Sequence, residues 1–205
     1  MSSTESETRT RILAKTVQLM EEQPGQTVRM QDIATAVGVS RQAVYLHFGS
    51  RTELLVAATR YVDEVRDLDG RLRKWNAAVT GIERLDEYIA FWGHYIPEVY
   101  GVAMALLAVR ETDKAAAAAW RDRMDAVRDG CHITIEALQR DGMLDPIWTC
   151  DKAIDLFWTM LAIRNWEQIT IECNWSTDQY VSWMQTVARR TFVREAYLEV
   201  KPQVM

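Results

Sequence analysis

The chain has 205 residues, of which 48% are apolar and 26% are charged, with nine glycines and four prolines. This composition is typical of a folded domain, and it excludes a collagenous or largely disordered chain. The formal net charge is −5, but residues 1–60 carry seven basic and six acidic side chains, so the acidic excess belongs to the remaining 145 residues.

Apolar residues recur at helical spacing along almost the whole chain, which predicts an all-α protein of about nine helices. Residues 1 to about 7 are small, polar and acidic, and we expect them to form a frayed tail. The first four helices are expected at about 8–22, 30–37, 40–48 and 51–73. Gly38 suits the end of the second helix, Ser40 can cap the third, and Ser50 begins a capping box for the fourth.

The rest of the chain predicts longer and more apolar helices. They are expected at about 82–96, 97–110, 113–140, 149–173 and 177–200. The second of these begins at Pro97, Gly142 ends the third, and Ser176 with Gln179 forms a capping box at the start of the last. Seven of the eight tryptophans lie between Trp92 and Trp183, so the two parts of the chain differ in composition.

Several classes of protein and site are not expected from this sequence. No apolar stretch approaches the roughly 18 residues that a membrane span requires, so we expect no membrane partner. The N-terminus lacks the basic and apolar segments of a secretory signal, which predicts a cytoplasmic protein. The cysteines at 131, 150 and 173 have no spacing typical of zinc, so we expect reduced thiols, no metal and no cofactor.

The short third helix carries the most informative residues. A step of 100° per residue places Val44 and Phe48 on one face, and the opposite face and its flanks hold other residues. These are Arg41, Gln42, Ala43, Tyr45, Leu46 and His47. Glutamine can bond an adenine edge, exposed Ala or Leu can contact a thymine methyl, and Arg, Tyr and His suit guanine or phosphate. A helix, a tight glycine turn and a helix with such a face predict a helix-turn-helix that binds DNA.

Residues 33–55, IATAVGVSRQAVYLHFGSRTELL, closely resemble the signature of the tetracycline-repressor (TetR) family of transcriptional regulators. The matching positions are Ile33, Ala34, Gly38, Val39, Ser40, Tyr45, His47, Phe48, Arg51 and Leu54. The resemblance extends over about residues 8–60. It implies a three-helix DNA-binding domain at residues 1–52 and an all-α ligand-binding and dimerisation domain at residues 53–205.

The resemblance also implies individual DNA contacts on a recognition helix from Ser40 to Phe48. It directs Arg41, Gln42, Ala43 and Leu46 to bases and Tyr45, His47 and Arg51 to phosphates, and it brings Gln31 of the second helix to the major groove. Arg51 stands where the family usually has Lys, and two further features depart from the family. Arg29 stands where a capping Ser or Thr is usual, so either Thr27 caps a shifted helix or Arg29 contacts phosphate. Glu5 and Glu7 replace the usual basic arm, which argues against a minor-groove contact by the tail.

Two further sets of residues are candidates for binding in the larger part. Aromatic and methionine side chains suit an apolar cavity, although ordinary core packing explains each of them as well. The ligand candidates are Trp92, Tyr95, Tyr100, Met104, Trp120, Met124, Trp158 and Trp166. The last two helices are apolar over a wide arc, which favours a partner subunit. The dimer candidates are Phe157, Leu161, Val181, Met184, Val187 and Ala188.

The sequence therefore predicts a homodimeric, ligand-responsive transcriptional regulator with a palindromic DNA operator. In this family such proteins are most often repressors, and ligand would move the fourth helix and change the separation of the two recognition helices. An activator and a regulator that responds to a protein stay open. So does an all-α enzyme or carrier with a vestigial DNA-binding domain. No nucleophile and base pair is evident, and His94 and His132 have no partner at catalytic or metal-binding spacing, so we expect no catalytic residues.

Overall fold

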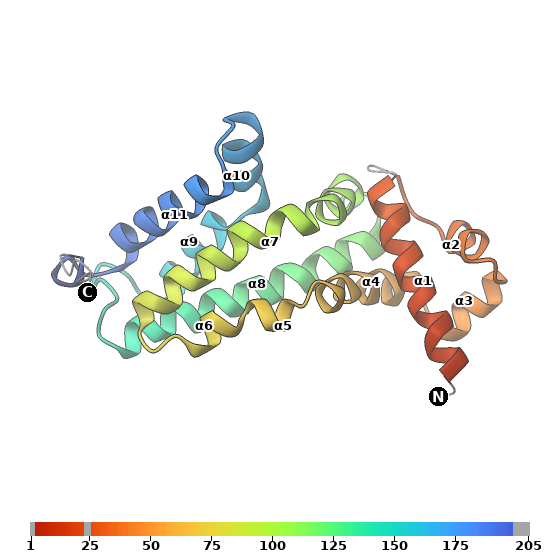
Figure 1. The fold of residues 1–205 in the computed structure, drawn as a ribbon, viewed down its shortest axis with the longest axis horizontal. Coiled ribbons are helices and arrows are strands. Elements are labelled where there is room, and N and C mark those ends of the chain that lie inside the picture. Colours follow the sequence, from red (N-terminus) through yellow and green to blue (C-terminus); the bar gives the residue numbers. More distant parts are fainter. Residues whose placement is uncertain (1–2, 23–25, 199–205) are drawn as a thin grey trace. The chain divides into compact units, whose positions relative to one another are not determined.

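The computed structural model describes residues 3–22 and 26–198, and these form helices joined by short connections (Figure 1). The α-helices are α1 (Ser3–Glu22), α2 (Met30–Val37), α3 (Arg41–His47), α4 (Arg51–Val65), α5 (Leu68–Arg71), α6 (Arg73–Ala77), α7 (Gly81–Val109), α8 (Lys114–Arg140), α9 (Cys150–Met160), α10 (Ile163–Glu167) and α11 (Thr177–Phe192). A π-helical segment (Gln168–Glu172) follows α10, and a 3-10 turn (Glu195–Tyr197) follows α11. The prediction of an all-α protein is confirmed. Within the described ranges, no helix is long and apolar enough to cross a membrane.

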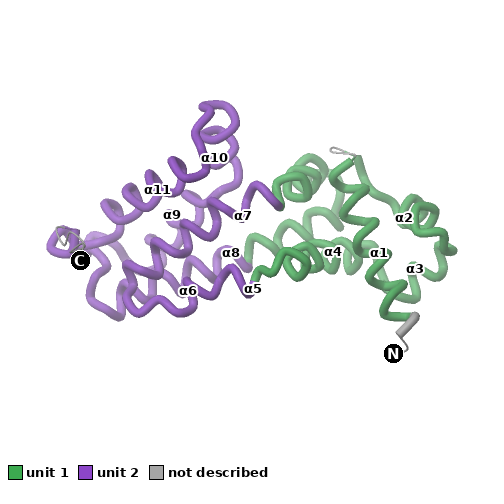
Figure 2. The backbone as a smooth tube through the Cα atoms, viewed as in Figure 1, with its two compact units in different colours: residues 1–68, 99–125 green, residues 69–98, 126–205 purple. Residues whose placement is uncertain are grey.

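The chain divides into two compact units (Figure 2). Unit 1 comprises residues 1–68 and 99–125, and unit 2 comprises residues 69–98 and 126–205. The domain boundary predicted at residue 52 lies inside unit 1 and stays a prediction. Unit 1 therefore contains all of α1 to α4 together with the end of α7 and the start of α8.

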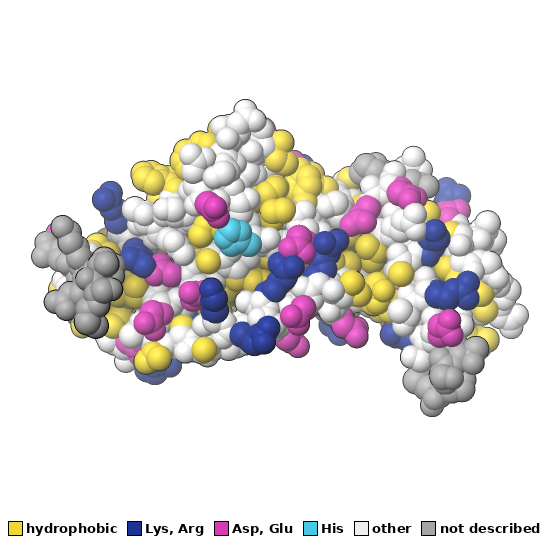
Figure 3. Space-filling model, in the orientation of Figure 1, with side chains coloured by type: hydrophobic (Ala, Val, Ile, Leu, Met, Phe, Trp, Pro, Cys, Tyr) yellow, Lys and Arg dark blue, Asp and Glu magenta, His cyan; other side chains and the backbone are white. Residues whose placement is uncertain are grey.

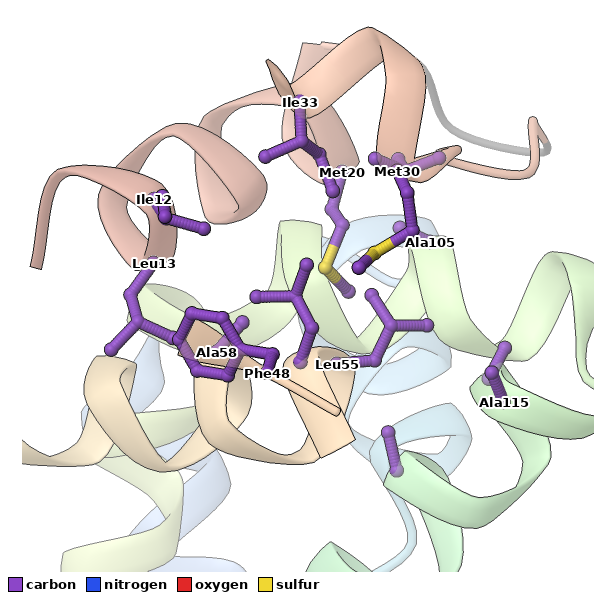
Figure 4. Packing of buried hydrophobic residues seen from close by; sticks show 14 of the residues in the cluster. Ile12, Leu13, Met20, Met30, Ile33, Phe48, Leu55, Ala58, Ala105 and Ala115 are labelled. Carbon is purple, nitrogen blue, oxygen red and sulfur yellow. The ribbon is translucent and has the colours of Figure 1, made fainter. Parts of the chain in front are cut away.

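Unit 1 is built around one hydrophobic core. Ile12, Ile33, Val44, Phe48 and Leu54 have no exposed surface, and the same core includes residues of α7 and α8. The α7 and α8 members are Val102, Ala105, Leu106, Val109, Ala115, Ala116 and Ala119. Figure 4 shows the Phe48 ring beside Leu13 and Ala58, which anchors the end of α3 to α1 and α4. The hydrophobic effect therefore holds α3 through its inner face alone and leaves its outer face free.

Unit 2 has an aromatic core centred on Tyr88. The Tyr88 ring lies 5.2 Å from Trp75, 6.0 Å from Phe157 and 6.2 Å from Trp92, measured between centroids. Its hydroxyl donates to the Val127 carbonyl at 2.9 Å, and burial raises the pKa of this phenol above its usual value. The ring cluster is thus closely packed and joins α6, α7, α8 and α9.

Several helices differ from the sequence-based expectation, and the described residues form eleven α-helices instead of about nine. The fourth ends at Val65 instead of about residue 73 and is followed by α5 and α6, and the last ends at Phe192 instead of about residue 200. The first begins at Ser3 instead of about Thr8, with Glu5 in its first turn, where a carboxylate interacts favourably with the helix dipole. Pro97 lies inside α7 instead of beginning a new helix. The helix expected at 149–173 breaks after Met160, where Ala162 leaves helical geometry with φ −59° and ψ 134°, and the Asn165 amide donates to the freed carbonyls of Thr159 and Met160 at 2.8 and 3.3 Å.

Candidate nucleic-acid interface

The turn between α2 and α3 depends on Gly38. This residue has φ +78° and ψ 34°, the left-handed region in which a side chain is strained. Its N–H donates to the Ala34 carbonyl at 3.0 Å, and the Val39 N–H donates to the same oxygen at 3.0 Å. The Ser40 hydroxyl then accepts from the Ala43 N–H at 3.0 Å and caps α3. The chain therefore reverses tightly and starts the third helix in a fixed register.

The start of α2 settles which residue caps this helix. Arg29 occupies the N-cap position with extended backbone angles, so the shifted start with Thr27 as the cap does not occur. The Arg29 N–H donates to the Asp32 carboxylate at 3.1 Å, so the acid inside the first turn supplies the reciprocal bond of a capping arrangement. Asp32, three residues after the N-cap, was the sequence signal for this. The Arg29 side chain is exposed.

The two faces of α3 have opposite character. Val44 is fully buried and Leu46 is 82% exposed, although both side chains are aliphatic. Arg41 and Gln42 are exposed and Ala43 is half-buried on the outward side. The outward face of α3 is therefore accessible and carries an aliphatic side chain beside Arg41 and Gln42.

The flanks of α3 carry the residues predicted to contact phosphates. Tyr45 is 39% exposed, and the Arg41 guanidinium lies 5.5 Å from its ring centroid. His47 is half-buried in the last turn. Gln31 is exposed on α2, and its amide lies 3.4 Å from the Thr35 hydroxyl. The structure thus leaves polar groups of all four residues accessible to a ligand.

Sequence reasoning missed two arginines of α1 that hold this region. The Arg9 guanidinium lies 4.7 Å above the Phe48 ring, a cation–π contact at the end of α3. Arg11 donates to the Val37 carbonyl at 2.8 Å, at the last residue of α2. Both arginines therefore fasten the helix-turn-helix to α1. Sequence reasoning missed these contacts because each arginine lies far along the chain from its partner.

Arg51, predicted to contact phosphate, is engaged within the protein. Its Nε donates to the Val28 carbonyl at 2.6 Å, and a terminal nitrogen donates to the Asp113 carboxylate at 2.6 Å. Burial disfavours ionisation of Asp113, but Arg51 and the N–H groups of Ala116 and Ala115 outweigh it and hold the pKa below its usual value. Asp113 is therefore an ionised, 8% exposed partner of Arg51.

A second group of ion pairs links α4 to α8 in the same unit. Arg60 pairs with Asp122, and Arg123 pairs with both Asp122 and Asp63. Arg60 is exposed, whereas Asp122, Arg123 and Asp63 are half-buried. Together with the Arg51–Asp113 pair at the start of α4, these ion pairs connect α4 to the beginning of α8 at two separate points along α4.

The predicted ligand residues are divided between the two compact units. Trp92, Tyr95, Trp158 and Trp166 belong to unit 2, and Tyr100, Met104, Trp120 and Met124 belong to unit 1. Tyr95 and Trp166 are buried, and the other six are half-buried.

Unit 2 contains buried polar atoms that have no hydrogen-bond partner within the described residues and that a ligand could use. Among them are Nε1 of Trp92 and the hydroxyl of Tyr180. Burial raises the pKa of Tyr180 to about 12, so this phenol is neutral at physiological pH. Each is therefore a donor that lacks an acceptor within unit 2.

The residues predicted at a dimer interface lie mainly inside the single chain. Phe157, Leu161, Val181, Met184 and Ala188 are buried, and Val187 is half-buried. They pack the core of unit 2, because the inner face of each helix is also apolar. The exposed apolar residues of the same region are Ile171, Trp175 and Trp183. Hydrophobic side chains are visible on this surface around α10 and α11 (Figure 3).

Trp175 and Trp183 also line a surface hollow of about 460 Å³ with Asp178, Gln179 and Ser182. Their ring centroids are 6.5 Å apart in an edge-to-face arrangement. His94 lies 3.7 Å from the Asp178 carboxylate. No group of three or more His, Cys, Asp or Glu side chains suited to a metal occurs in the described part of the chain.

Comparison with known proteins identifies the family of the helix-turn-helix region. The family model for "Bacterial regulatory proteins, tetR family" matches residues 12–58. The nucleoid occlusion factor SlmA of Marinomonas sp. (strain MWYL1) is 33% identical over 64 residues, which are 31% of this chain and 32% of that protein. The matched segment thus spans about a third of this relative's length. The prediction of a TetR-type helix-turn-helix is confirmed.

Solved structures resemble the chain over nearly its whole length. A protein from Saccharomonospora viridis, described as a transcriptional regulator and solved with choline, has a TM-score of 0.71 at 19% identity over 93% of this chain and 100% of that one. The transcriptional regulator FadR from Bacillus subtilis, solved with stearoyl-CoA, has a TM-score of 0.69 at 11% identity over 88% of this chain and 97% of that one. At these identities the likeness establishes the fold.

Proposed function

We propose that this chain, whose residues 12–58 belong to the tetR family of bacterial regulatory proteins, is a sequence-specific transcriptional regulator that binds a palindromic operator as a homodimer. A small, largely apolar ligand would release it, so that it acts as a repressor. One observation carries the proposal: α3 buries Val44 completely and exposes Leu46 at 82%, with Arg41 and Gln42 beside it. This is the chemistry that base edges in a major groove require.

The DNA contacts follow from the position of each side chain on α2 and α3. Arg41, Gln42, Ala43 and Leu46 would contact bases from the outward face of α3. Tyr45 and His47 would bind phosphates on its flanks, and Gln31 would approach from α2. Ser40 uses its oxygen to cap α3, but its hydroxyl can still donate to a phosphate. Such a protein works in the cytoplasm, where it has access to its operator.

The homodimer would use the exposed apolar surface of unit 2. Trp183 is 52% exposed, Ile171 is 49% exposed and Trp175 is 38% exposed, and all three lie between α10 and the middle of α11. Large exposed aromatic side chains of this kind favour association of two copies. A two-fold dimer places two recognition helices on successive turns of a duplex, which explains the expected palindrome.

The effector would enter the aromatic region of unit 2. The rings around Tyr88 and Trp92 favour an apolar molecule, and the unpartnered donors of Trp92 and Tyr180 favour one with a hydrogen-bond acceptor. The complexes of the structural relatives with choline and stearoyl-CoA support a small-molecule role for this fold. Binding would lower operator affinity only if the ligand prefers the DNA-free state. The protein would then act by binding and not by catalysis.

The test is a selection from random DNA duplexes by the purified protein at about 0.15 M salt, where non-specific phosphate binding is weakened. We expect a palindromic consensus with half-sites about 34 Å apart. Arg41→Ala and Gln42→Ala should abolish selective binding and leave the dimer intact. Arg190→Ala, which removes an exposed charge from α11, is the matched control. No enrichment by a folded dimer would refute the proposal and favour a ligand carrier or enzyme.

A further inference from the structure

Arg51 closes the ends of the segment that holds every other predicted DNA contact. Val28 precedes α2 by two residues, and Arg51 is the first residue of α4, directly after the loop that follows α3. The bond of 2.6 Å from Arg51 Nε to the Val28 carbonyl ties these two ends together. This guanidinium therefore helps to position α2 and α3, together with the hydrophobic core and the contacts of Arg9 and Arg11.

The same guanidinium fastens the closed segment to the start of α8. Its terminal nitrogen donates to Oδ1 of Asp113 at 2.6 Å, and that oxygen also accepts from the N–H groups of Ala115 and Ala116. The second oxygen, Oδ2, is buried with no hydrogen-bond partner in the described part of the chain. Asp113 thus depends on Arg51 for its only side-chain partner among the described contacts, and a planar guanidinium can make both bonds at once.

We propose that Arg51 is a positioning residue, which orients the helix-turn-helix by holding Val28 and Asp113 together, and that it does not bind a DNA phosphate. This inference rests on the proposed DNA-binding function. Both bonds leave the guanidinium facing the protein, and its side chain is 21% exposed. The two bonds use two of the five N–H donors of the guanidinium, and swinging the side chain outward to reach a phosphate would leave a buried carboxylate unpaired, which is strongly unfavourable.

The test compares Arg51→Ala, Asp113→Ser and the double variant in binding to the selected operator, measured as a function of salt. Serine keeps the cap of α8 and removes the carboxylate that Arg51 requires. We expect each single variant to weaken binding about fivefold, and the double variant to weaken it no further, because the two residues act as one unit. The slope of log affinity against log salt should stay at its wild-type value. If Arg51 instead neutralised a phosphate, Arg51→Ala would lower this slope by about 0.9.

Arg51→Lys separates the two roles if Arg51→Ala does not fold. Lysine keeps the charge that a phosphate needs, but it cannot make the two bonds of the guanidinium. We expect it to bind as weakly as Arg51→Ala. Wild-type affinity in Arg51→Lys, a lower salt slope in Arg51→Ala, or additive losses in the double variant would each overturn the proposal. A wild-type protein that enriches no DNA would instead refute the proposed function itself.

Discussion

Replacing Leu46 by alanine separates the stability of α3 from its function. Because Leu46 is 82% exposed, its removal should change the free energy of unfolding by less than about 0.5 kcal/mol. In the complex, the lost methyl groups would no longer be buried against a base. We expect a loss of about 1.5 kcal/mol, which is about a tenfold weaker operator complex. The loss should concentrate at one base pair that presents a thymine methyl.

Val44→Ala is the matched control on the same helix. Val44 is fully buried, so this variant should lower the free energy of unfolding by about 2 kcal/mol through lost burial and a cavity. Its folded fraction should bind the operator normally. Urea unfolding and fluorescence anisotropy with labelled operator measure the two quantities. If Leu46→Ala kept both wild-type affinity and wild-type base preference, the outward face of α3 would not be the surface that reads DNA.

Three further predictions concern the turn, the dimer and the response to acid. Gly38→Ala should lower the free energy of unfolding by about 1 kcal/mol, because φ +78° is strained for alanine even in open space, and thermal unfolding with an unchanged midpoint would contradict this. Trp183→Ser should shift the dimer toward monomer in sedimentation equilibrium and leave the secondary structure unchanged, and a dimer of wild-type stability would exclude this surface. The pKa of Asp113 is lowered in the folded state, so its contribution to stability is present above the ordinary value of 3.8 and is lost as the pH falls through the lower folded value. Urea unfolding below pH 4 should therefore show a smaller loss for Asp113→Ser than for the wild type, and equal losses would contradict the assignment.

The local features of the DNA-binding region could be predicted from the sequence. A helical step of 100° was enough to separate Val44 from Leu46, and Gly38 and Ser40 mark the turn and cap by their own chemistry. Such features depend only on neighbouring residues, so a single sequence contains them completely. The family match of residues 12–58 agrees with this local interpretation.

Features that depend on distant partners could not be predicted in this way. The partner of Arg51 lies 62 residues later in the chain, and nothing beside Arg51 indicates it. The wide apolar arc of the last helices was a correct observation, but it did not show which side faces the chain's own core. The structure buries Phe157 and Ala188 completely and exposes Trp183, so the outer side is the tryptophan side.

The hydrophobic core of unit 1 limits how this protein can be divided and recombined. A gene fragment that ended at residue 68 would encode α1 to α4 without Val102, Leu106 and Ala119, which complete their core. The fragment would expose the apolar surface that these residues cover, so it should aggregate or remain partly unfolded. Exchange of the DNA-binding segment, residues 1–68, between related regulators would therefore succeed only when residues 99–125 are transferred with it. The residues that determine DNA specificity and the parts of α7 and α8 that complete their core should thus be inherited together, although residues 69–98 of unit 2 separate them along the chain.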